Sequence, residues 1–218
     1  LKPAAGDYIV TPVETSPGVY TGFPEGIEID DITGAINVSK SETGLRYQIT
    51  HTALDGTVTT TKVVLSGISF KDKYYNLSLN DSVAFPVYNA DESIAVPING
   101  SVFDDGGGAK LSGCDVQTIN GQINLAQTVR NGLFGNNPID DARKEIDIVY
   151  RLNDGSNKSL NKLRVKLYYY TSMADVAPDL LETLQDRQDQ GVFLRGGSTT
   201  GFNRVAKPSP PCIIIIAR

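Results

Sequence analysis

The chain has 218 residues, enough for one large or two small domains, and 40% of them are hydrophobic while 21% are charged, a composition that can build a core. Its 20 Lys and Arg against 25 Asp and Glu give a net charge of −5 at pH 7, which argues against a nucleic-acid-binding protein because such proteins need a basic face. No apolar run reaches the ~18 residues of a membrane-spanning helix, and one His with two Cys excludes a His-rich or Cys-rich metal centre.

Two alternating stretches, one in each half of the chain, carry the clearest sign of β-structure. In each, apolar and polar residues alternate with the period of two that a half-buried strand has, an Asp-Gly pair comes next, and a second β-rich run follows. Asp-Gly favours a tight hairpin because both central residues of a type I′ turn have positive φ. The predicted hairpins are Leu45 to His51, Asp55-Gly56 and Thr59 to Phe70, and Glu145 to Leu152, Asp154-Gly155 and Leu160 to Tyr170.

A likeness between residues 26–38 and 113–125 predicts an internal repeat. Five positions are identical at a spacing of 87 residues and three more are apolar in both copies: Gly26, Ile27, Ile29, Ile32, Gly34, Ile36, Asn37 and Val38 correspond to Gly113, Cys114, Val116, Ile119, Gly121, Ile123, Asn124 and Leu125. The spacing is 99 at the Asp-Gly turns, so the second copy needs an insertion, most simply at the loop-like Phe134 to Ala142. We interpret this as duplication of a β module; the alternative is a chance likeness of two strand–turn–strand units.

The repeat divides the chain into two expected domains, residues 1–80 and residues 81–218. The segment Leu77 to Ser82 joins the two copies as a linker or a shared strand. Inside the second copy, the glycine run that ends the stretch Asp104 to Gly108 predicts a flexible loop.

One helix and one buried strand are expected near the C-terminus. The helix is predicted over 175–190, because Pro178 suits a first helical turn and three leucines that follow it share one face. The strand is predicted over 212–217, where four consecutive Ile are apolar on both faces. Such a strand has to be buried on both sides, since exposed it would promote aggregation.

The stretch Phe23 to Ile36 resembles the Ig-like, cadherin-like modules of bacterial (Bacteroidetes-type) cell-surface proteins. Those modules carry a pattern with Pro-X-Gly, then Ile-Asp, then Thr-Gly-X-Ile, which here reads Pro24 to Gly26, Ile29-Asp30 and Thr33 to Ile36. Where the family has a Thr-Pro turn this chain has Ser39 to Glu42, and the second half matches only through the repeat. The resemblance implies a mostly β protein of two tandem Ig-like sandwich modules, used in adhesion, as a spacer or in glycan-associated assemblies.

Few side chains suit catalysis. His51 is the single histidine, so any Ser-His or Cys-His mechanism has to use it, and it lies in an alternating strand on the face of Tyr47 and Ile49, which favours a structural role. Cys114 and Cys212 are a redox or ligand pair, a long-range disulfide, or two buried thiols. No nucleophile elbow, phosphate loop or dinucleotide fingerprint occurs, and no catalytic or cofactor-binding residue is assigned.

Two kinds of binding residue remain as candidates. Acidic pairs are candidate Ca²⁺ ligands, although the spaced Asp-X-Asp-X-Asp pattern is absent and solvated turn residues are the alternative. Tyrosines are candidate contacts for a sugar or a protein, with packing as the alternative. The acidic candidates are Asp30-Asp31, Asn80-Asp81, Asp104-Asp105 and Asp140-Asp141, and the tyrosines are Tyr74-Tyr75 and Tyr169 within Tyr168 to Tyr170.

The function expected from these observations is non-enzymatic. The chain, which begins at Leu1 and shows no signal-like stretch, is interpreted as a mature or trimmed form of an extracellular, cell-surface or periplasmic protein. It would serve as a structural or adhesion protein whose partner is a surface protein or glycan, without nucleic acid and without a transmembrane segment. The alternative is a carbohydrate-binding module of a surface polysaccharide-uptake system.

Overall fold

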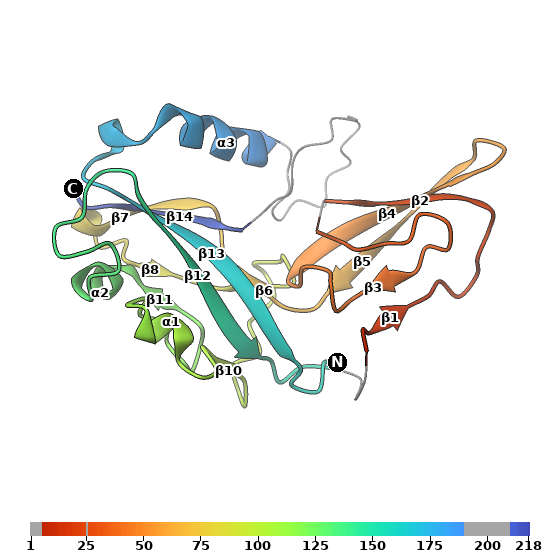
Figure 1. Ribbon diagram of the computed structural model, residues 1–218, viewed down its shortest axis with the longest axis horizontal. Coiled ribbons are helices and arrows are strands. Elements are labelled where there is room, and N and C mark those ends of the chain that lie inside the picture. The colour runs from red at the N-terminus through yellow and green to blue at the C-terminus, as the bar shows by residue number, and fades with distance from the viewer. Residues whose placement is uncertain (1–5, 25, 190–209) are drawn as a thin grey trace.

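The computed structural model describes residues 6–24, 26–189 and 210–218 and is rich in β-structure (Figure 1). The strands are β1 (Ile9–Val10), β2 (Gly18–Phe23), β3 (Ile36–Asn37), β4 (Leu45–Ala53), β5 (Val58–Leu65), β6 (Ile68–Ser69), β7 (Lys73–Asn76), β8 (Val83–Ala84), β9 (Val87–Tyr88), β10 (Val102–Phe103), β11 (Ile123–Asn124), β12 (Ala142–Arg151), β13 (Leu160–Tyr170) and β14 (Cys212–Ile216). The helices are α1 (Gly108–Leu111), α2 (Leu125–Arg130) and α3 (Pro178–Asp189), with single 3₁₀ turns at η1 (Leu77–Leu79) and η2 (Met173–Asp175).

The first unit is a small antiparallel sheet with one thin covering layer. Strands β2, β4 and β5 pair in that order, and the short pair β1–β3 lies against one face (Figure 1). The alternation read from the sequence places Tyr47 and Ile49 on that face, where they pack with Tyr20 and Ile36 in a core of their own. The predicted hairpin between β4 and β5 is therefore confirmed.

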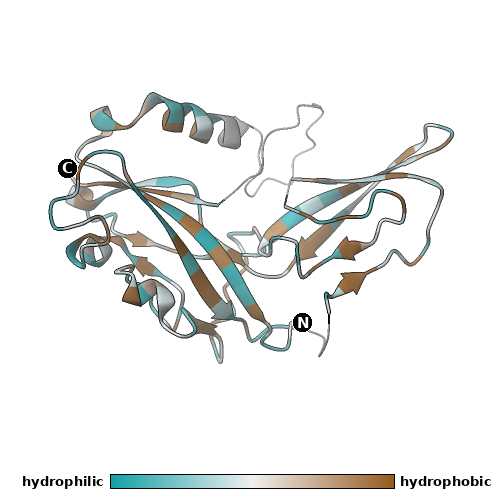
Figure 2. Cartoon of the chain, in the orientation of Figure 1, coloured by the Kyte–Doolittle hydropathy of each residue, from teal (hydrophilic) through white to brown (hydrophobic). Residues whose placement is uncertain are grey.

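The second unit is larger and has three layers. Its sheet has the strand order β10-β12-β13-β14-β7, with α3 on one face and the short elements β8, β11, α1 and α2 on the other (Figure 1). Apolar and polar residues alternate along β12 and β13 (Figure 2), and the hairpin predicted between them is confirmed. The two faces of this sheet hold two separate clusters of buried side chains.

Strand β14 explains the run of four isoleucines. It pairs in parallel with β13 on one side and with β7 on the other, so it is a central strand. Ile213 and Ile215 pack into one cluster, Ile214 and Ile216 into the other, and all four are 0% exposed. The predicted strand and helix are confirmed with slightly shorter bounds, although the last residue of the predicted helix lies outside the described residues.

The internal repeat is present in the backbone. Hydrogen bonds of the first unit recur in the second between residues that correspond, and Gly34 and Gly121 turn the chain with φ of 70° and 71°. The pairs, amide donor first, are Gly34 to Asp30 and Gly121 to Gln117; Asp30 to Ala35 and Gln117 to Gln122; Asn37 to Glu28 and Asn124 to Asp115; Tyr20 to Asp31 and Phe103 to Thr118; and Val38 to Tyr8 and Leu125 to Ser82.

Side chains repeat the same pattern. The Ser41 hydroxyl donates to the Asn37 carbonyl and accepts from the Glu28 amide, at 2.7 and 2.9 Å. Thr128 makes the corresponding bonds to the Asn124 carbonyl and from the Asp115 amide, at 2.8 and 2.9 Å. A chance likeness of two turns would not preserve these longer-range bonds, so the units share one design.

The structural repeat extends further toward the N-terminus than the sequence likeness at residues 26–38 and 113–125. Strand β1 pairs with β3 as β8 pairs with β11, which makes residues 7–13 correspond to residues 81–87. Asp7, Pro12 and Val13 then match Asp81, Pro86 and Val87, a likeness too short to identify by itself.

The expected division after residue 80 coincides with the start of the second repeat. The residues that pack in the core of the second unit, however, begin earlier in the chain than residue 80. Ile68, Phe70 and Tyr75 are buried in the second unit, and β7 is an edge strand of its sheet. The chain segment 66–80 therefore follows the first repeat in sequence and packs with the second. The physical reason is pairing with β14, which no local pattern reveals.

Three local expectations need correction. In the Asp-Gly turns only Gly56 has positive φ, and the second loop places positive φ at Asn157 and Lys158 instead.

The predicted flexible loop before residue 109 contains the start of α1, because the buried Asp104 carboxylate accepts the amides of Ala109 and Lys110 at 2.8 and 2.9 Å. The segment proposed as a linker or shared strand forms the turn η1 before β8.

Cys114 and Cys212 are separate buried thiols, so the disulfide reading is wrong. Burial raises the pKa of Cys114 to about 12, which keeps its thiol protonated and unreactive. Among the described residues, no helix has the length and apolar character needed to cross a membrane.

Candidate functional site

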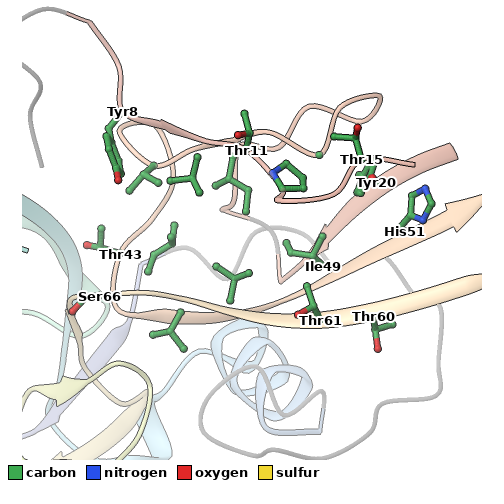
Figure 3. A pocket seen from close by; sticks show the side chains of 18 of the residues that line it. Tyr8, Thr11, Thr15, Tyr20, Thr43, Ile49, His51, Thr60, Thr61 and Ser66 are labelled. Atoms are coloured by element: carbon green, nitrogen blue, oxygen red, sulfur yellow. The ribbon is translucent and has the colours of Figure 1, made fainter. Parts of the chain in front are cut away.

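The first unit borders a cavity of about 880 Å³. It lies between the segment 8–16, which includes β1, and the inner face of strands β4 and β5 (Figure 3). Most of its lining is apolar, and the polar groups are mainly hydroxyls. A space of this size and composition is typical of a binding site.

The cavity exists because β5 is poorly covered. Its inner face carries Thr61 and Val63, which lie across from Ile49 and Tyr47 of β4. Thr61 is exposed and Val63 is only half-buried. At the corresponding positions of β13 in the second unit, Leu163 is half-buried and Val165 is 0% exposed. The inner face of this strand is thus better covered in the second repeat than in the first.

The outer edge of β5 is also open. Within the described part of the chain, β5 pairs with β4 alone, whereas β13 pairs with β12 on one side and, over residues 166–170, with β14 on the other. Backbone N–H and C=O groups along such an edge have no ladder partner and are free to pair with another strand.

One end of the cavity is formed by the loop between β12 and β13, which a carboxylate holds in place. Asp154 Oδ2 accepts hydrogen bonds from the Ser66 hydroxyl at 2.6 Å and the Tyr88 hydroxyl at 2.9 Å, and Oδ1 accepts from the Ser156 amide at 2.8 Å. Burial by itself raises the pKa of Asp154, but these hydrogen bonds outweigh it and bring the pKa below the ordinary 3.8. The ionised carboxylate therefore stabilises the join between the two units.

A paired substitution tests this role of Asp154. Because its folded pKa lies below its unfolded pKa, its contribution to stability is present above about pH 4 and is lost as the pH falls through the folded value. We expect Asp154→Asn to lower the free energy of unfolding at pH 7 by about 1–2 kcal/mol and to reduce its fall between pH 4 and pH 2. Urea unfolding followed by circular dichroism measures both.

Asp55 supplies the control, since it occupies the corresponding turn of the first unit and accepts the Thr57 amide at 2.9 Å without the two hydroxyl contacts. Asp55→Asn should change stability by less than about 0.5 kcal/mol. Equal effects of the two substitutions would contradict the role given to Ser66 and Tyr88.

His51 lines the cavity and packs against an aromatic ring. Its ring packs on Tyr20 with the centroids 4.4 Å apart, and its Nε2 has no hydrogen bond to any described residue. Ser156 Oγ, at the other end of the cavity, is the second buried side-chain polar atom without such a partner. Both atoms have almost no accessible surface, so neither offers an open contact to a bound molecule.

Most of the carboxylates proposed as Ca²⁺ ligands make hydrogen bonds or ion pairs within the fold. Asp30 accepts the amides of Ile32 and Thr33, and Asp104 caps α1. Asp141 binds Arg143 and Tyr170. In the described part of the chain no three His, Cys, Asp or Glu side chains gather as a metal site would require.

The tyrosines proposed as a binding platform mostly pack in the core. Tyr75, Tyr168 and Tyr170 are buried, and Tyr74 is half-buried beside α3. Tyr169 is half-buried with its ring 5.7 Å from that of Phe134. Burial therefore favours the packing interpretation for Tyr75, while Tyr74 and Tyr169 keep part of their surface exposed.

Sequence reasoning did not identify the cavity, although part of its signal was present. Thr61 stands at the inward position where Leu163 stands in the second unit, so β5 is more polar than β13 at that position. No family model matches this chain, and no protein in a search of curated sequences matches it.

Proposed function

We propose that this chain is a non-enzymatic structural or adhesion protein of the cell surface, the periplasm or the extracellular space, and that its two units are Ig-like modules used for protein interaction. One observation carries the proposal: in the described part of the chain, β5 is an edge strand of its sheet and lies beside an apolar cavity. An open edge beside an apolar hollow suits the binding of another chain.

The chemistry around the cavity supports binding over catalysis. The single histidine has no hydrogen bond to a hydroxyl or carboxylate among the described residues, so no nucleophile–base pair is formed there. The thiol of Cys114 is buried, and burial raises its pKa. Thr, Val and Ile dominate the inner wall, and these side chains offer contact area without reactivity.

Carbohydrate binding is the alternative and has less support. Sugar sites typically present a flat, exposed aromatic surface. The tyrosines proposed for that role pack against Phe134, α3 or the sheet. An interaction through the backbone of an edge strand and an apolar cavity requires none of these tyrosines.

A cell experiment with a photoreactive residue tests the proposal. In the organism that makes the protein, p-benzoylphenylalanine replaces Thr60 on β5 or, as the control, Thr21 on β2; both are exposed threonines on edge strands of one sheet. We expect a protease that cannot cross the inner membrane to cleave the protein. We also expect cross-links to a partner protein from position 60 and none from position 21. A protease-resistant cytoplasmic protein, or cross-links of equal yield at both positions, would contradict the proposal.

A further inference from the structure

We propose that Asn99 is a site of spontaneous modification, at which the backbone amide of Gly100 attacks the Asn99 side chain and converts this asparagine into aspartate and isoaspartate. The reaction needs no enzyme and no cofactor, because both reacting groups belong to one exposed turn. It adds a negative charge to the second unit after the chain has folded.

The sequence contains three Asn-Gly pairs, the dipeptide in which this attack is least hindered because glycine has no Cβ. The pairs are Asn99-Gly100, Asn120-Gly121 and Asn131-Gly132. The first two both follow an isoleucine, so they share the local sequence Ile-Asn-Gly. A difference in reactivity between these two pairs therefore reports mainly on the fold around them.

The fold restrains both reacting groups of the second pair. The amide of Gly121 donates to the carbonyl of Gln117 at 2.8 Å, so this hydrogen bond has to break before the nitrogen can attack. The side chain of Asn120 accepts the amide of Gln122 at 3.1 Å, which holds the carboxamide in place. Reaction at this pair requires both bonds to open.

The third pair is restrained in the same way. The amide of Gly132 donates to the carbonyl of Val129 at 3.0 Å. The carboxamide of Asn131 accepts from the Gln127 side chain at 2.7 Å and donates to the Gly113 carbonyl at 3.3 Å. Neither group of this pair can reach the other without a loss of hydrogen bonds.

The first pair has neither restraint. Asn99 and Gly100 are exposed in a turn that the Ser101 amide closes by donating to the carbonyl of Ile98 at 3.0 Å. Among the described residues, the Gly100 amide has no hydrogen-bond acceptor and the Asn99 side chain has no hydrogen-bond partner. The nucleophile and the carboxamide are therefore both able to move toward each other.

Two neighbouring groups favour loss of the Gly100 amide proton, which has to precede the attack. The Asn153 side chain donates to the carbonyl of Asn99 at 3.0 Å, and a donor on this carbonyl makes the attached N–H more acidic. The Lys158 ammonium lies 3.6 Å from where a Cβ on Gly100 would stand, close enough to stabilise negative charge on the nitrogen.

The chemical steps balance with water as the only co-reactant. The Gly100 nitrogen gives its proton to hydroxide and bonds to Cγ of Asn99. The side-chain amide group then takes a proton from water and leaves as ammonia, so that a cyclic imide remains. Water opens this imide in one of two ways. Breakage of the bond from Cγ to nitrogen gives aspartate, and breakage of the bond from the Asn99 carbonyl carbon to nitrogen gives isoaspartate, whose backbone is one carbon longer.

The test incubates the whole folded protein in mildly alkaline buffer and follows each Asn-Gly pair by peptide mass spectrometry after digestion at acidic pH, which stops further reaction. We expect the acid to accumulate at position 99 about tenfold or more faster than at positions 120 and 131, where hydrogen bonds have to break first. The rate at position 99 should rise with pH, because the deprotonated amide is the attacking group. In concentrated urea, where the fold no longer restrains any pair, the three rates should be similar.

A variant and a second readout make the assignment specific. Asn99→Gln should lose the reaction at position 99, because its longer side chain would have to form a larger ring, and should leave positions 120 and 131 unchanged. An isoaspartyl methyltransferase should label the peptide that contains position 99. Similar rates at positions 99 and 120 in the folded protein would overturn the inference. Aspartate without isoaspartate at position 99 would also overturn it, because that result means direct hydrolysis of the side chain without attack by Gly100.

Discussion

Ile215→Ala is expected to destabilise the second unit by about 3–4 kcal/mol, because it removes three buried carbons at a place that cannot collapse. Ile215 is 0% exposed in the middle of β14, and its neighbours on that face include Ile213 and Leu167. The strand is held by parallel partners on both sides, so the backbone cannot move inward to fill the space. Urea unfolding measures the loss.

Two further substitutions make this result specific. Ile215→Val removes a single carbon and should cost about 1 kcal/mol. Val58→Ala removes β-branched carbons from β5, where the side chain is 58% exposed, and should cost less than about 0.5 kcal/mol. A cost below about 1 kcal/mol for Ile215→Ala would contradict burial of β14 on both faces.

The same strand shows how far sequence reasoning reaches. Four consecutive isoleucines predict a strand buried on both sides, because β-branched residues favour strands and alternate side chains of a strand point to opposite faces. They do not say which strands lie beside it. Residues 73–76 pair with residues 213–216, although the two segments lie far apart in the sequence. Such pairing depends on packing between distant segments, which a short stretch of sequence does not reveal.

The sequence reveals the repeat because its turns depend on local geometry. Turn residues such as Gly34 and Gly121 are fixed by local geometry, so they stay recognisable after the surrounding side chains have diverged. The short strands β1 and β8 are recognised by what they pair with, and two residues of β-structure carry too little pattern to be seen. The candidate site depends on the short strand β1 and on the edge position that β5 has among the described residues, which is why the sequence predicts the unit but not its cavity.

Gly121→Ala is expected to cost about 3 kcal/mol or more, the sum of a backbone term and a packing term. Gly121 has φ of 71°, which L residues other than Asn and Asp rarely adopt. An added Cβ would lie 2.6 Å from Cδ1 of Phe103, a ring that is 0% exposed and cannot withdraw. Gly132→Ala isolates the backbone term, because φ there is 78° and the nearest atom to an added Cβ is 3.8 Å away on Asn136; its cost should be about 1 kcal/mol.

The corresponding glycine of the first unit extends the test to the repeat. At Gly34, φ is 70° and an added Cβ would lie 2.9 Å from the ring of Tyr20, the residue that takes the place of Phe103. Tyr20 is 8% exposed and borders the cavity, so its ring has room to shift. Gly34→Ala should therefore cost more than Gly132→Ala and less than Gly121→Ala when urea unfolding of the three is compared. Equal costs at positions 34 and 121 would mean that the first unit is as tightly packed as the second, which the open face of β5 argues against.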